Sequence, residues 1–261
     1  MTASTSQEDV RLSEGVSIPL IGFGTWQLDG DDAYNGVRAA LEIGYRHIDT
    51  ATAYGNEDRV GAAVRDSGLG RENVFITTKC PPGNVGLEAQ TLDASLKSLG
   101  VDFVDLWLVH WPPHGEAKPD TWKAFIEALE QGKTRAIGVS NYSIAQIDEP
   151  IAATGQPPAL NQIPWNPFVF SEREVGELRD RDVVLEGYSP LKKSDLSNPV
   201  LAEIAAAHGK TAAQVILRWH VEHGFVVIPR SSRKERIKEN FDIFDFDLST
   251  DEISKINGLS A

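Results

Sequence analysis

The chain has 261 residues, and 41% of them are hydrophobic, which is enough for a large buried core. The formal net charge of −13 argues against a surface for nucleic acid or anionic membranes, because such a chain would be repelled. The single cysteine, Cys80, excludes an intrachain disulfide and a thiolate cluster for zinc or iron–sulfur. No apolar run approaches the roughly 18 residues of a membrane span. We therefore expect a cytoplasmic protein, with residues 1–9 flexible and polar rather than a signal sequence.

Short apolar runs alternate with segments of helical periodicity along the chain. Residues 10–19, with Gly15 at the turn, predict a β-hairpin. Tyr34, Val37 and Leu41 then recur at helical spacing before the next apolar run, and the same alternation continues to the C-terminal segment. The runs predicted as strands are residues 20–22, 46–48, 74–78, 103–109, 134–139, 159–163, 183–187 and 225–228.

Eight strands alternating with helices in about 250 residues predict a closed (β/α)₈ TIM barrel, an α/β fold. We expect residues 1–261 to form a single domain, with the hairpin closing the N-terminal end of the barrel and a short C-terminal tail after a helix near residues 253–256. The alternative is a doubly wound sheet with a glycine-rich turn. Gly22 and Gly24 do not favour it, because Gln27 stands where the third glycine belongs.

Four titratable residues follow predicted strands, namely Asp49, Tyr54, Lys79 and His110, and barrel chemistry lies at those strand ends. Tyr54 is the best candidate for a general acid, with an ordinary pKa of about 10. A cation about 4 Å away contributes roughly 4 kcal/mol, which lowers that pKa before the cost of desolvation is subtracted. Lys79 supplies the cation and Asp49 keeps it charged. His110 orients a carbonyl or shares in the proton transfer.

Protonation of a carbonyl oxygen requires a nucleophile for the carbon. A Schiff base on Lys79 would compete with its pairing to Asp49, so a hydride from a cofactor is favoured. A basic cluster directly after the last predicted strand agrees with a phosphate-bearing cofactor. Within that cluster, Arg230 and Arg236 suit a 2′-phosphate, which predicts NADPH, with NADH as the weaker alternative. The cluster comprises Arg230, Arg233, Lys234, Arg236 and Lys238.

Three motifs carry a resemblance to a known family. Residues 44–51, GYRHIDTA, continue to Glu57 and Gly61, and residues 137–142 read IGVSNY. The third motif runs from IPRS at residues 228–231 to Asn240. Together they resemble the three signatures of the aldo-keto reductase family, and in particular its bacterial branch that includes diketogluconate reductases.

The resemblance implies that Asp49, Tyr54, Lys79 and His110 form the catalytic tetrad, with Tyr54 as proton donor. It also implies that polar residues after the middle strands hold the nicotinamide carboxamide, while Tyr188 stacks on the ring. The residues predicted to bind the cofactor are Gly24, Thr25, Trp26, Ser140, Asn141, Gln162, Tyr188, Ser189, Pro190, Leu191, Arg230, Ser231, Ser232, Arg236, Glu239 and Asn240. Those predicted to meet substrate are Trp26, Tyr54, His110 and Trp111.

The predicted function is NADPH-dependent reduction of small aldehydes, ketones, dicarbonyls or keto-sugars to alcohols, by a monomer without a metal ion. The short tail predicts an open pocket and broad substrate selectivity. Two alternatives remain: a nucleotide-sensing subunit without turnover, and a metal-dependent hydrolase on the same barrel. The hydrolase is disfavoured because His110 and His114 are separated by two prolines and lack a carboxylate partner.

Overall fold

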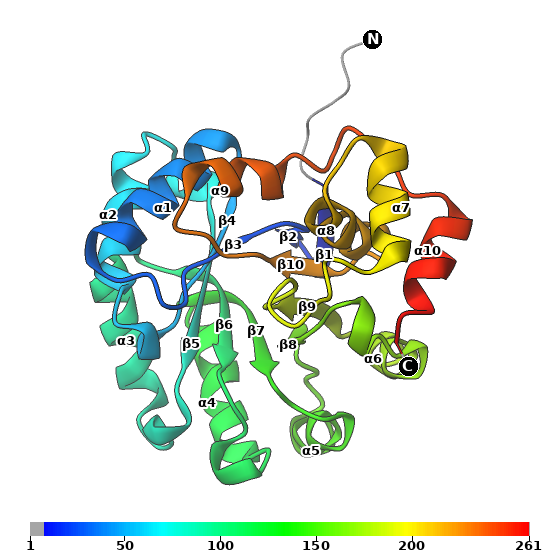
Figure 1. The fold of residues 1–261 in the computed structure, drawn as a ribbon. Helices are drawn as coiled ribbons and strands as arrows, with labels where there is room; N and C mark the ends of the chain where they lie inside the picture. The colour runs from blue at the N-terminus through cyan, green and yellow to red at the C-terminus, as the bar shows by residue number, and fades with distance from the viewer. Residues whose placement is uncertain (1–7, 261) are drawn as a thin grey trace.

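Eight parallel strands form the centre of the computed structural model, which describes residues 8–260 (Figure 1). They pair in chain order from β3 to β10. The ring closes where Ile21 bridges Val227 and the Gly22 amide donates to the Val227 carbonyl at 2.9 Å. The predicted (β/α)₈ barrel is therefore confirmed. The strands are β3 (Phe23–Gly24), β4 (His47–Asp49), β5 (Phe75–Cys80), β6 (Val104–Val109), β7 (Thr134–Ser140), β8 (Leu160–Pro164), β9 (Val184–Tyr188) and β10 (Val226–Ile228).

The first barrel strand lies later in the chain than its apolar run predicted. Residues 20–22 were expected to form it, but β3 is Phe23–Gly24, and Ile21 contributes only an isolated bridge. The cause is a change of partner at Leu20. Its amide donates to the Glu8 carbonyl beside the hairpin, while its carbonyl accepts from Val227 in the barrel.

Ten α-helices of the described chain surround the barrel (Figure 1). Three of them begin with a capping box that satisfies first-turn amides, with Ser143, Thr211 and Ser249 as the N-caps. The helices are α1 (Gly30–Ile43), α2 (Glu57–Asp66), α3 (Glu88–Leu99), α4 (Pro119–Glu130), α5 (Ile144–Thr154), α6 (Glu172–Arg179), α7 (Pro199–His208), α8 (Ala212–Glu222), α9 (Lys234–Phe241) and α10 (Thr250–Asn257). Short 3₁₀ turns are η1 (Thr52–Tyr54), η2 (Arg71–Asn73), η3 (Pro82–Asn84), η4 (Pro113–Gly115) and η5 (Pro167–Val169).

Close packing joins the helices to the strands and to one another. Trp107 on β6 stacks on Phe125 of α4, with ring centroids 3.6 Å apart. Helices α2 and α3 approach so closely that a Cβ at Gly61 would lie 2.0 Å from the Leu99 carbonyl oxygen. Only glycine fits at that crossing, which gives Gly61 of the first motif a packing role.

The predicted hairpin consists of β1 (Asp9–Ser13) and β2 (Val16–Pro19), which pair antiparallel. Its apolar side chains Leu12, Val16 and Ile18 are buried in the core. The Arg135 guanidinium, near the start of β7, donates to the carbonyl of Gly15 at the turn. The hairpin therefore covers the N-terminal end of the barrel, as predicted.

The first and the last described segments lie outside the ring of eight strands. Asp9, the last residue of the segment expected to be flexible, pairs with Pro19 in the hairpin. Residues 1–7 lie outside the described residues. The predicted last helix is α10, which packs against α7 and η5 (Figure 1). Among residues 8–260, no helix is long and apolar enough to cross a membrane.

Candidate active site

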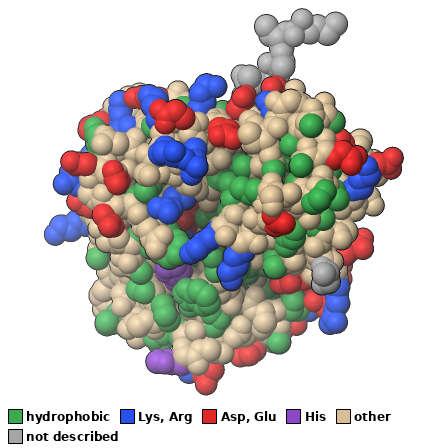
Figure 2. Space-filling view, in the orientation of Figure 1, with side chains coloured by type: hydrophobic (Ala, Val, Ile, Leu, Met, Phe, Trp, Pro, Cys, Tyr) green, Lys and Arg blue, Asp and Glu red, His purple; other side chains and the backbone are tan. Residues whose placement is uncertain are grey.

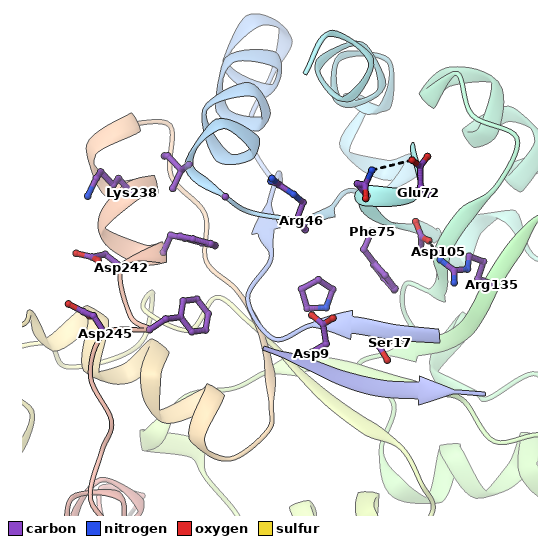
Figure 3. A pocket seen from close by; sticks show the side chains of 16 residues that line it. Asp9, Ser17, Arg46, Glu72, Phe75, Asp105, Arg135, Lys238, Asp242 and Asp245 are labelled. Carbon is purple, nitrogen blue, oxygen red and sulfur yellow. Dashed lines mark hydrogen bonds and ion pairs between the residues drawn. The ribbon is translucent and has the colours of Figure 1, made fainter. Parts of the chain in front are cut away.

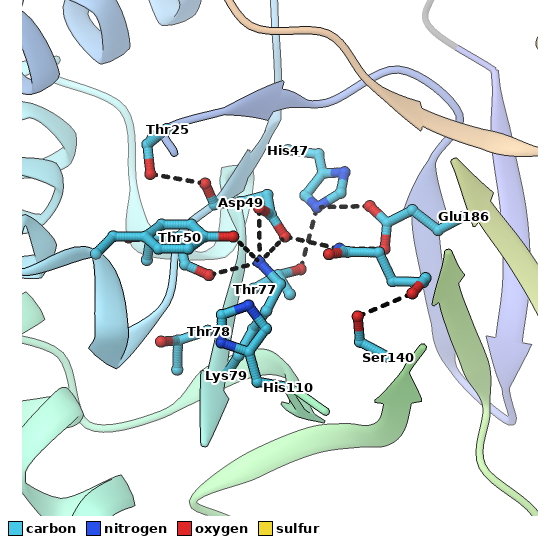
Figure 4. Close-up of polar contacts among 12 residues, drawn as sticks. Thr25, His47, Asp49, Thr50, Thr77, Thr78, Lys79, His110, Ser140 and Glu186 are labelled. Atoms are coloured by element: carbon cyan, nitrogen blue, oxygen red, sulfur yellow. Dashed lines mark hydrogen bonds and ion pairs between the residues drawn. The ribbon is translucent and has the colours of Figure 1, made fainter. Parts of the chain in front are cut away.

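The four titratable residues singled out in the sequence meet at the C-terminal ends of neighbouring strands (Figure 4). Asp49 is the last residue of β4, and Lys79 lies one residue before the end of β5. His110 directly follows β6, while Tyr54 ends the short turn η1 that follows β4. Converging strand ends thus bring together groups that are far apart in sequence.

Lys79 is the centre of this group, and its side chain is fully buried. Its Nζ donates to both carboxylate oxygens of Asp49 at 2.7 Å and to the Thr50 carbonyl at 2.8 Å. The Tyr54 hydroxyl lies 3.4 Å from the same nitrogen. A buried ammonium needs this full set of partners, because an unpaired charge would be costly. Tyr54 is the one of these three partners that is not fully buried.

The pKa of Tyr54 moves opposite to the effect expected from Lys79 alone. Burial raises the pKa of the phenol, and this outweighs the lowering by the Lys79 charge. Burial alone would lower the pKa of Lys79, but the neighbouring Asp49 carboxylate and Tyr54 raise it above its ordinary value. Tyr54 is therefore a protonated phenol beside a fixed cation, which is the state that a proton donor needs.

His110 is a neutral imidazole at physiological pH. Burial, followed by the charge of Lys79, lowers its pKa to about 3. Its ring meets that of Tyr54 edge to face, with centroids 5.6 Å apart. A neutral imidazole has one N–H donor, so His110 can orient a carbonyl oxygen at Tyr54. Of the two roles left open for it, orientation is favoured over proton transfer.

Two buried residues behind the tetrad were missed in the sequence. Glu186 on β9 and His47 on β4 both have fully buried side chains (Figure 4). Burial, followed by the charge of Asp49, raises the pKa of Glu186 to about 8. Burial and the charge of Lys79 lower the pKa of His47 to about 3. Both lie two residues before the end of their strand, whereas Asp49 and Lys79 lie at the end or one residue before it. The available signal was a polar residue within an apolar run. Glu186 lies two positions before Tyr188, and His47 lies two positions before Asp49, so each points to the same face of its strand as that predicted site residue.

Predicted cofactor residues gather at the ends of β7, β8 and β9. The Ser140 hydroxyl donates to the Gln162 carbonyl at 2.8 Å. The Asn141 Nδ2 donates to Ser140 Oγ and to the His110 carbonyl, while its Oδ1 accepts from the Tyr188 hydroxyl at 2.9 Å. These residues therefore form one connected network beside the tetrad.

The loop after β10 carries the predicted phosphate site. The Arg230 guanidinium reaches the Gln27 carbonyl at 3.3 Å, and Glu239 accepts from the Thr211 hydroxyl at 2.9 Å. Arg236 is exposed and makes no side-chain hydrogen bond or ion pair within residues 8–260. Asn240 is buried, and Ser231 and Ser232 lie in the loop before α9. Figure 2 shows Lys and Arg side chains beside a hollow at the centre of this face.

The remaining predicted residues lie around the mouth of the barrel. The side chains of Trp26 and Trp111 are exposed by 42% and 48%. Lys192 Nζ lies 4.9 Å from the Trp26 ring centroid, which connects the loop after β9 to the loop after β3. Thr25 is fully buried and donates to the Asp49 carbonyl at 2.9 Å, so its hydroxyl points into the protein. Gly24 follows the barrel closure, while Ser189, Pro190 and Leu191 follow β9.

A cavity of about 720 Å³ lies at the opposite end of the barrel (Figure 3). It is lined by residues near the starts of strands, such as Arg46, Phe75 and Asp105, and by Asp9 and Ser17 of the hairpin. No tetrad residue lines it. Chemistry on this fold lies at the C-terminal strand ends, so the tetrad, and not this cavity, is the candidate active site. Residues 8–260 contain no group of three or more His, Cys, Asp or Glu able to hold a metal ion.

Residues 20–261 match the model of the aldo/keto reductase family. The chain belongs to that family. An aldo-keto reductase of Mycolicibacterium smegmatis is 45% identical over 96% of this chain and 92% of its own length. The glyoxal reductase of Bacillus subtilis is 41% identical over 98% of this chain and 94% of its own. The glycerol 2-dehydrogenase (NADP(+)) of Saccharomyces cerevisiae is 39% identical over 99% of this chain and 93% of its own.

A solved aldo/keto reductase from Brucella melitensis has the same fold. It superimposes with a TM-score of 0.94 at 43% identity, covering 98% of each chain. The aldo/keto reductase fold thus accounts for the eight parallel strands and their helices. The family membership that the three motifs predicted is confirmed. This aldo/keto reductase is an oxidoreductase whose relatives include carbonyl reductases.

Proposed function

We propose that this aldo/keto reductase uses NADPH to reduce the carbonyl group of small aldehydes, ketones, dicarbonyls or keto-sugars to an alcohol. The observation that carries the proposal is Lys79 Nζ, held by Asp49 at 2.7 Å and lying 3.4 Å from the Tyr54 hydroxyl. The B. subtilis relative is named a glyoxal reductase and the yeast relative an NADP(+) dehydrogenase, and both names support this choice.

The residues at the ends of β7 and β8 fit the carboxamide of a nicotinamide. Both hydrogens of the Gln162 amide donate to carboxyl groups inside the barrel, at 2.9 and 3.1 Å. Both donors of Asn141 are likewise engaged by Ser140 and His110. The Gln162 carbonyl oxygen is thus kept for a further donor, which suits the NH₂ group of a carboxamide. Asn141 Oδ1 accepts from the Tyr188 hydroxyl and has a second lone pair for such a donor. Tyr188 supplies a flat ring at the adjacent strand end.

The tetrad residues divide the proton chemistry among them. Bound NADPH supplies the hydride for the carbonyl carbon. Tyr54 donates its hydroxyl proton to the carbonyl oxygen, and Lys79 stabilises the phenolate that results. Asp49 keeps Lys79 charged and fixed. His110, as a neutral donor, orients the carbonyl oxygen.

The adenosine end of the cofactor is assigned to the loop after β10 and to α9. Arg230 and Arg236 take the 2′-phosphate with Ser231 and Ser232, which gives NADPH its preference over NADH. Glu239 and Asn240 lie at the adenine. The residues Gly24, Thr25, Trp26, Ser189, Pro190 and Leu191 complete the assigned cofactor site.

The substrate site is assigned to the exposed mouth of the barrel. Trp26 and Trp111 provide its apolar walls, with Tyr54 and His110 at the base. Two large exposed rings contact many shapes of small carbonyl compound, which supports broad selectivity. A substrate panel in which one compound exceeds all others by several orders of magnitude in kcat/KM would contradict this part of the proposal.

We also infer that the protein is a single-domain, cytoplasmic monomer and that it belongs to the branch of the family that includes diketogluconate reductases.

The proton-donor role is tested by Tyr54→Phe, which removes only the hydroxyl. The wild type should oxidise NADPH in the presence of an aldehyde, with or without a chelator, and Tyr54→Phe should lose turnover by about 10²-fold or more. Tyr34→Phe is the matched control, because its hydroxyl bonds to Asp66 on the helical surface. Wild-type turnover in Tyr54→Phe would refute the assignment. Loss of activity with a chelator would favour a metal-dependent reaction.

A further inference from the structure

Glu186 is a buried acid directly behind the tetrad that the proposed chemistry does not use. Its side chain is fully buried on β9. Its Oε2 accepts a hydrogen bond from Gln162 Nε2 at 3.1 Å. Its Oε1 has no hydrogen-bond partner and lies 3.9 Å from His47 Nε2. Figure 4 shows Glu186 to the right of Asp49 and His47, with His110 below them. A barrel interior can hold such a group only with a defined charge state and partner.

The Gln162 side chain connects Glu186 to Asp49. Its Nε2 donates one hydrogen to Asp49 Oδ2 at 2.9 Å and the other to Glu186 Oε2. A primary amide has two N–H donors on one side and a carbonyl oxygen on the other. The reversed amide would place its oxygen against two carboxyl oxygens. Asp49 Oδ2 and Glu186 Oε2 therefore both favour the orientation in which the carbonyl oxygen of Gln162 points away from the two carboxyl groups.

The charges around Glu186 favour its neutral form. The titratable groups that face it are His47 and Asp49 from β4, Lys79 from β5 and Tyr54 from η1. Lys79 is already paired with Asp49, and His47 is neutral. An ionised Glu186 would add a second buried negative charge without its own cation. Accordingly, burial and the Asp49 charge raise the pKa of Glu186 to about 8.

We propose that Glu186 is a positioning residue that, as a neutral acid, accepts one amide hydrogen of Gln162 and thereby turns the Gln162 carbonyl toward the carboxamide of bound NADPH. The inference rests on the proposed function for the identity of the cofactor. The orientation of the amide and the neutral state of Glu186 are properties of the protein without cofactor. They can therefore be measured separately from turnover.

The binding test compares two substitutions at Glu186. Glu186→Gln keeps a neutral acceptor of the same shape, so its Kd for NADPH should stay within about twofold of wild type. Glu186→Leu removes the acceptor and frees the Gln162 amide, so its Kd should rise about tenfold. Asp105→Asn is the matched control, a buried carboxylate at the other end of the barrel. It should lower the melting temperature without changing the Kd.

The charge state is tested in the protein without cofactor. A carboxyl whose pKa rises on folding binds more protons in the folded than in the unfolded state, so it destabilises the fold increasingly as pH rises from its unfolded pKa to its folded pKa. The melting temperature of Glu186→Gln should therefore gain on that of wild type between about pH 5 and pH 8, and the gap should then stay constant. A Glu186 that stays ionised in the folded protein would give a gap that does not depend on pH over this range.

Each outcome supports or overturns the inference. A wild-type Kd in Glu186→Leu, or an equal loss in Glu186→Gln and Glu186→Leu, refutes the positioning role of a neutral acid. A constant gap in melting temperature refutes the neutral state. If the wild type binds no NADPH, the proposed function fails, while the pH-dependent gap still tests Glu186. If the wild type reduces aldehydes and Glu186→Leu is unchanged, only the inference fails.

Discussion

Arg236 and Lys234 on α9 differ in what they already contact. Lys234 Nζ is paired with Glu42 at 2.9 Å, whereas Arg236 has no side-chain partner among residues 8–260. A guanidinium without a protein partner can bind a phosphate without first breaking an ion pair. Arg236 is therefore a stronger candidate than Lys234 for binding the 2′-phosphate of NADPH.

We predict that Arg236→Ala raises the KM for NADPH by roughly ten- to a hundredfold, the usual loss of a charge-assisted hydrogen bond. The KM for NADH should change little, since NADH lacks that phosphate. Steady-state kinetics with both cofactors provide the measurement, and Lys234→Ala is the control with a smaller expected effect. Equal increases for the two cofactors would rule out phosphate recognition by Arg236.

The sequence located those residues that lie at or beside the C-terminal ends of strands, because all these ends of a barrel lie on the same face. Asp49, Lys79 and His110 were found in that way. Glu186 and His47 were missed, since a polar residue inside an apolar run gives no sign of its partners. The net pKa shift of Tyr54 also needed coordinates, because it depends on how burial balances the charge of Lys79.

The packing of helices shows another property that the sequence does not reveal, namely which helical glycines are required at a close contact. Gly61 in α2 and Gly176 in α6 are both helical glycines, and helical periodicity alone does not distinguish them. In the structure, a Cβ at Gly61 would collide with the backbone of Leu99, whereas a Cβ at Gly176 meets nothing within 4 Å. The same substitution should therefore have opposite effects at the two sites.

We predict that Gly61→Ala destabilises the protein by about 1–3 kcal/mol, because α2 and α3 must move apart. Gly176→Ala should stabilise it by about 0.5–1 kcal/mol through the better helix propensity of alanine. Thermal or urea unfolding of the two variants measures both changes. A stabilised Gly61→Ala would show that the crossing of α2 and α3 is looser than described.

The element boundaries followed hydrogen bonding more closely than hydrophobicity. The apolar run 20–22 predicted the first strand, but Leu20 is shared between the hairpin and the barrel, and β3 begins at Phe23. The remaining predicted strands lie within a few residues of β4 to β10. Apolar runs mark that a strand exists, while the partner strand decides where it begins.

Over the whole molecule, the two ends of the barrel carry different buried charges. Asp49 pairs with Lys79 at the C-terminal end, and Asp105 pairs with Arg71 and Arg135 at the other. Asp105 also accepts from the Ile76 amide at 2.9 Å, and Arg135 reaches the hairpin turn at Gly15. Asp105 thus ties β5, β6 and β7 to the hairpin that covers the barrel.

We predict that Asp105→Asn lowers the free energy of unfolding by about 2–3 kcal/mol, because a buried carboxylate with two cationic partners is lost while solvent screens the half-exposed Arg135. Turnover and the Kd for NADPH should remain those of the wild type. Chemical denaturation and cofactor titration on the same preparation test both statements. A large loss of turnover in the folded variant would contradict the separation of the two ends.

The separation of the two barrel ends also affects which substitutions the protein can accept. Strands β4 and β5 place Asp49 and Lys79 at the C-terminal end of the barrel, and His110 directly follows β6. Asp105 lies near the start of β6, at the N-terminal end. The melting temperature can then be raised by substitutions at the N-terminal end of the barrel. Substrate selectivity can be changed separately, by varying the loops at the C-terminal end. The strands keep the stabilising substitutions apart from the loop substitutions that change selectivity. The protein can accordingly be stabilised first, and the loops around its active-site opening can be varied afterwards.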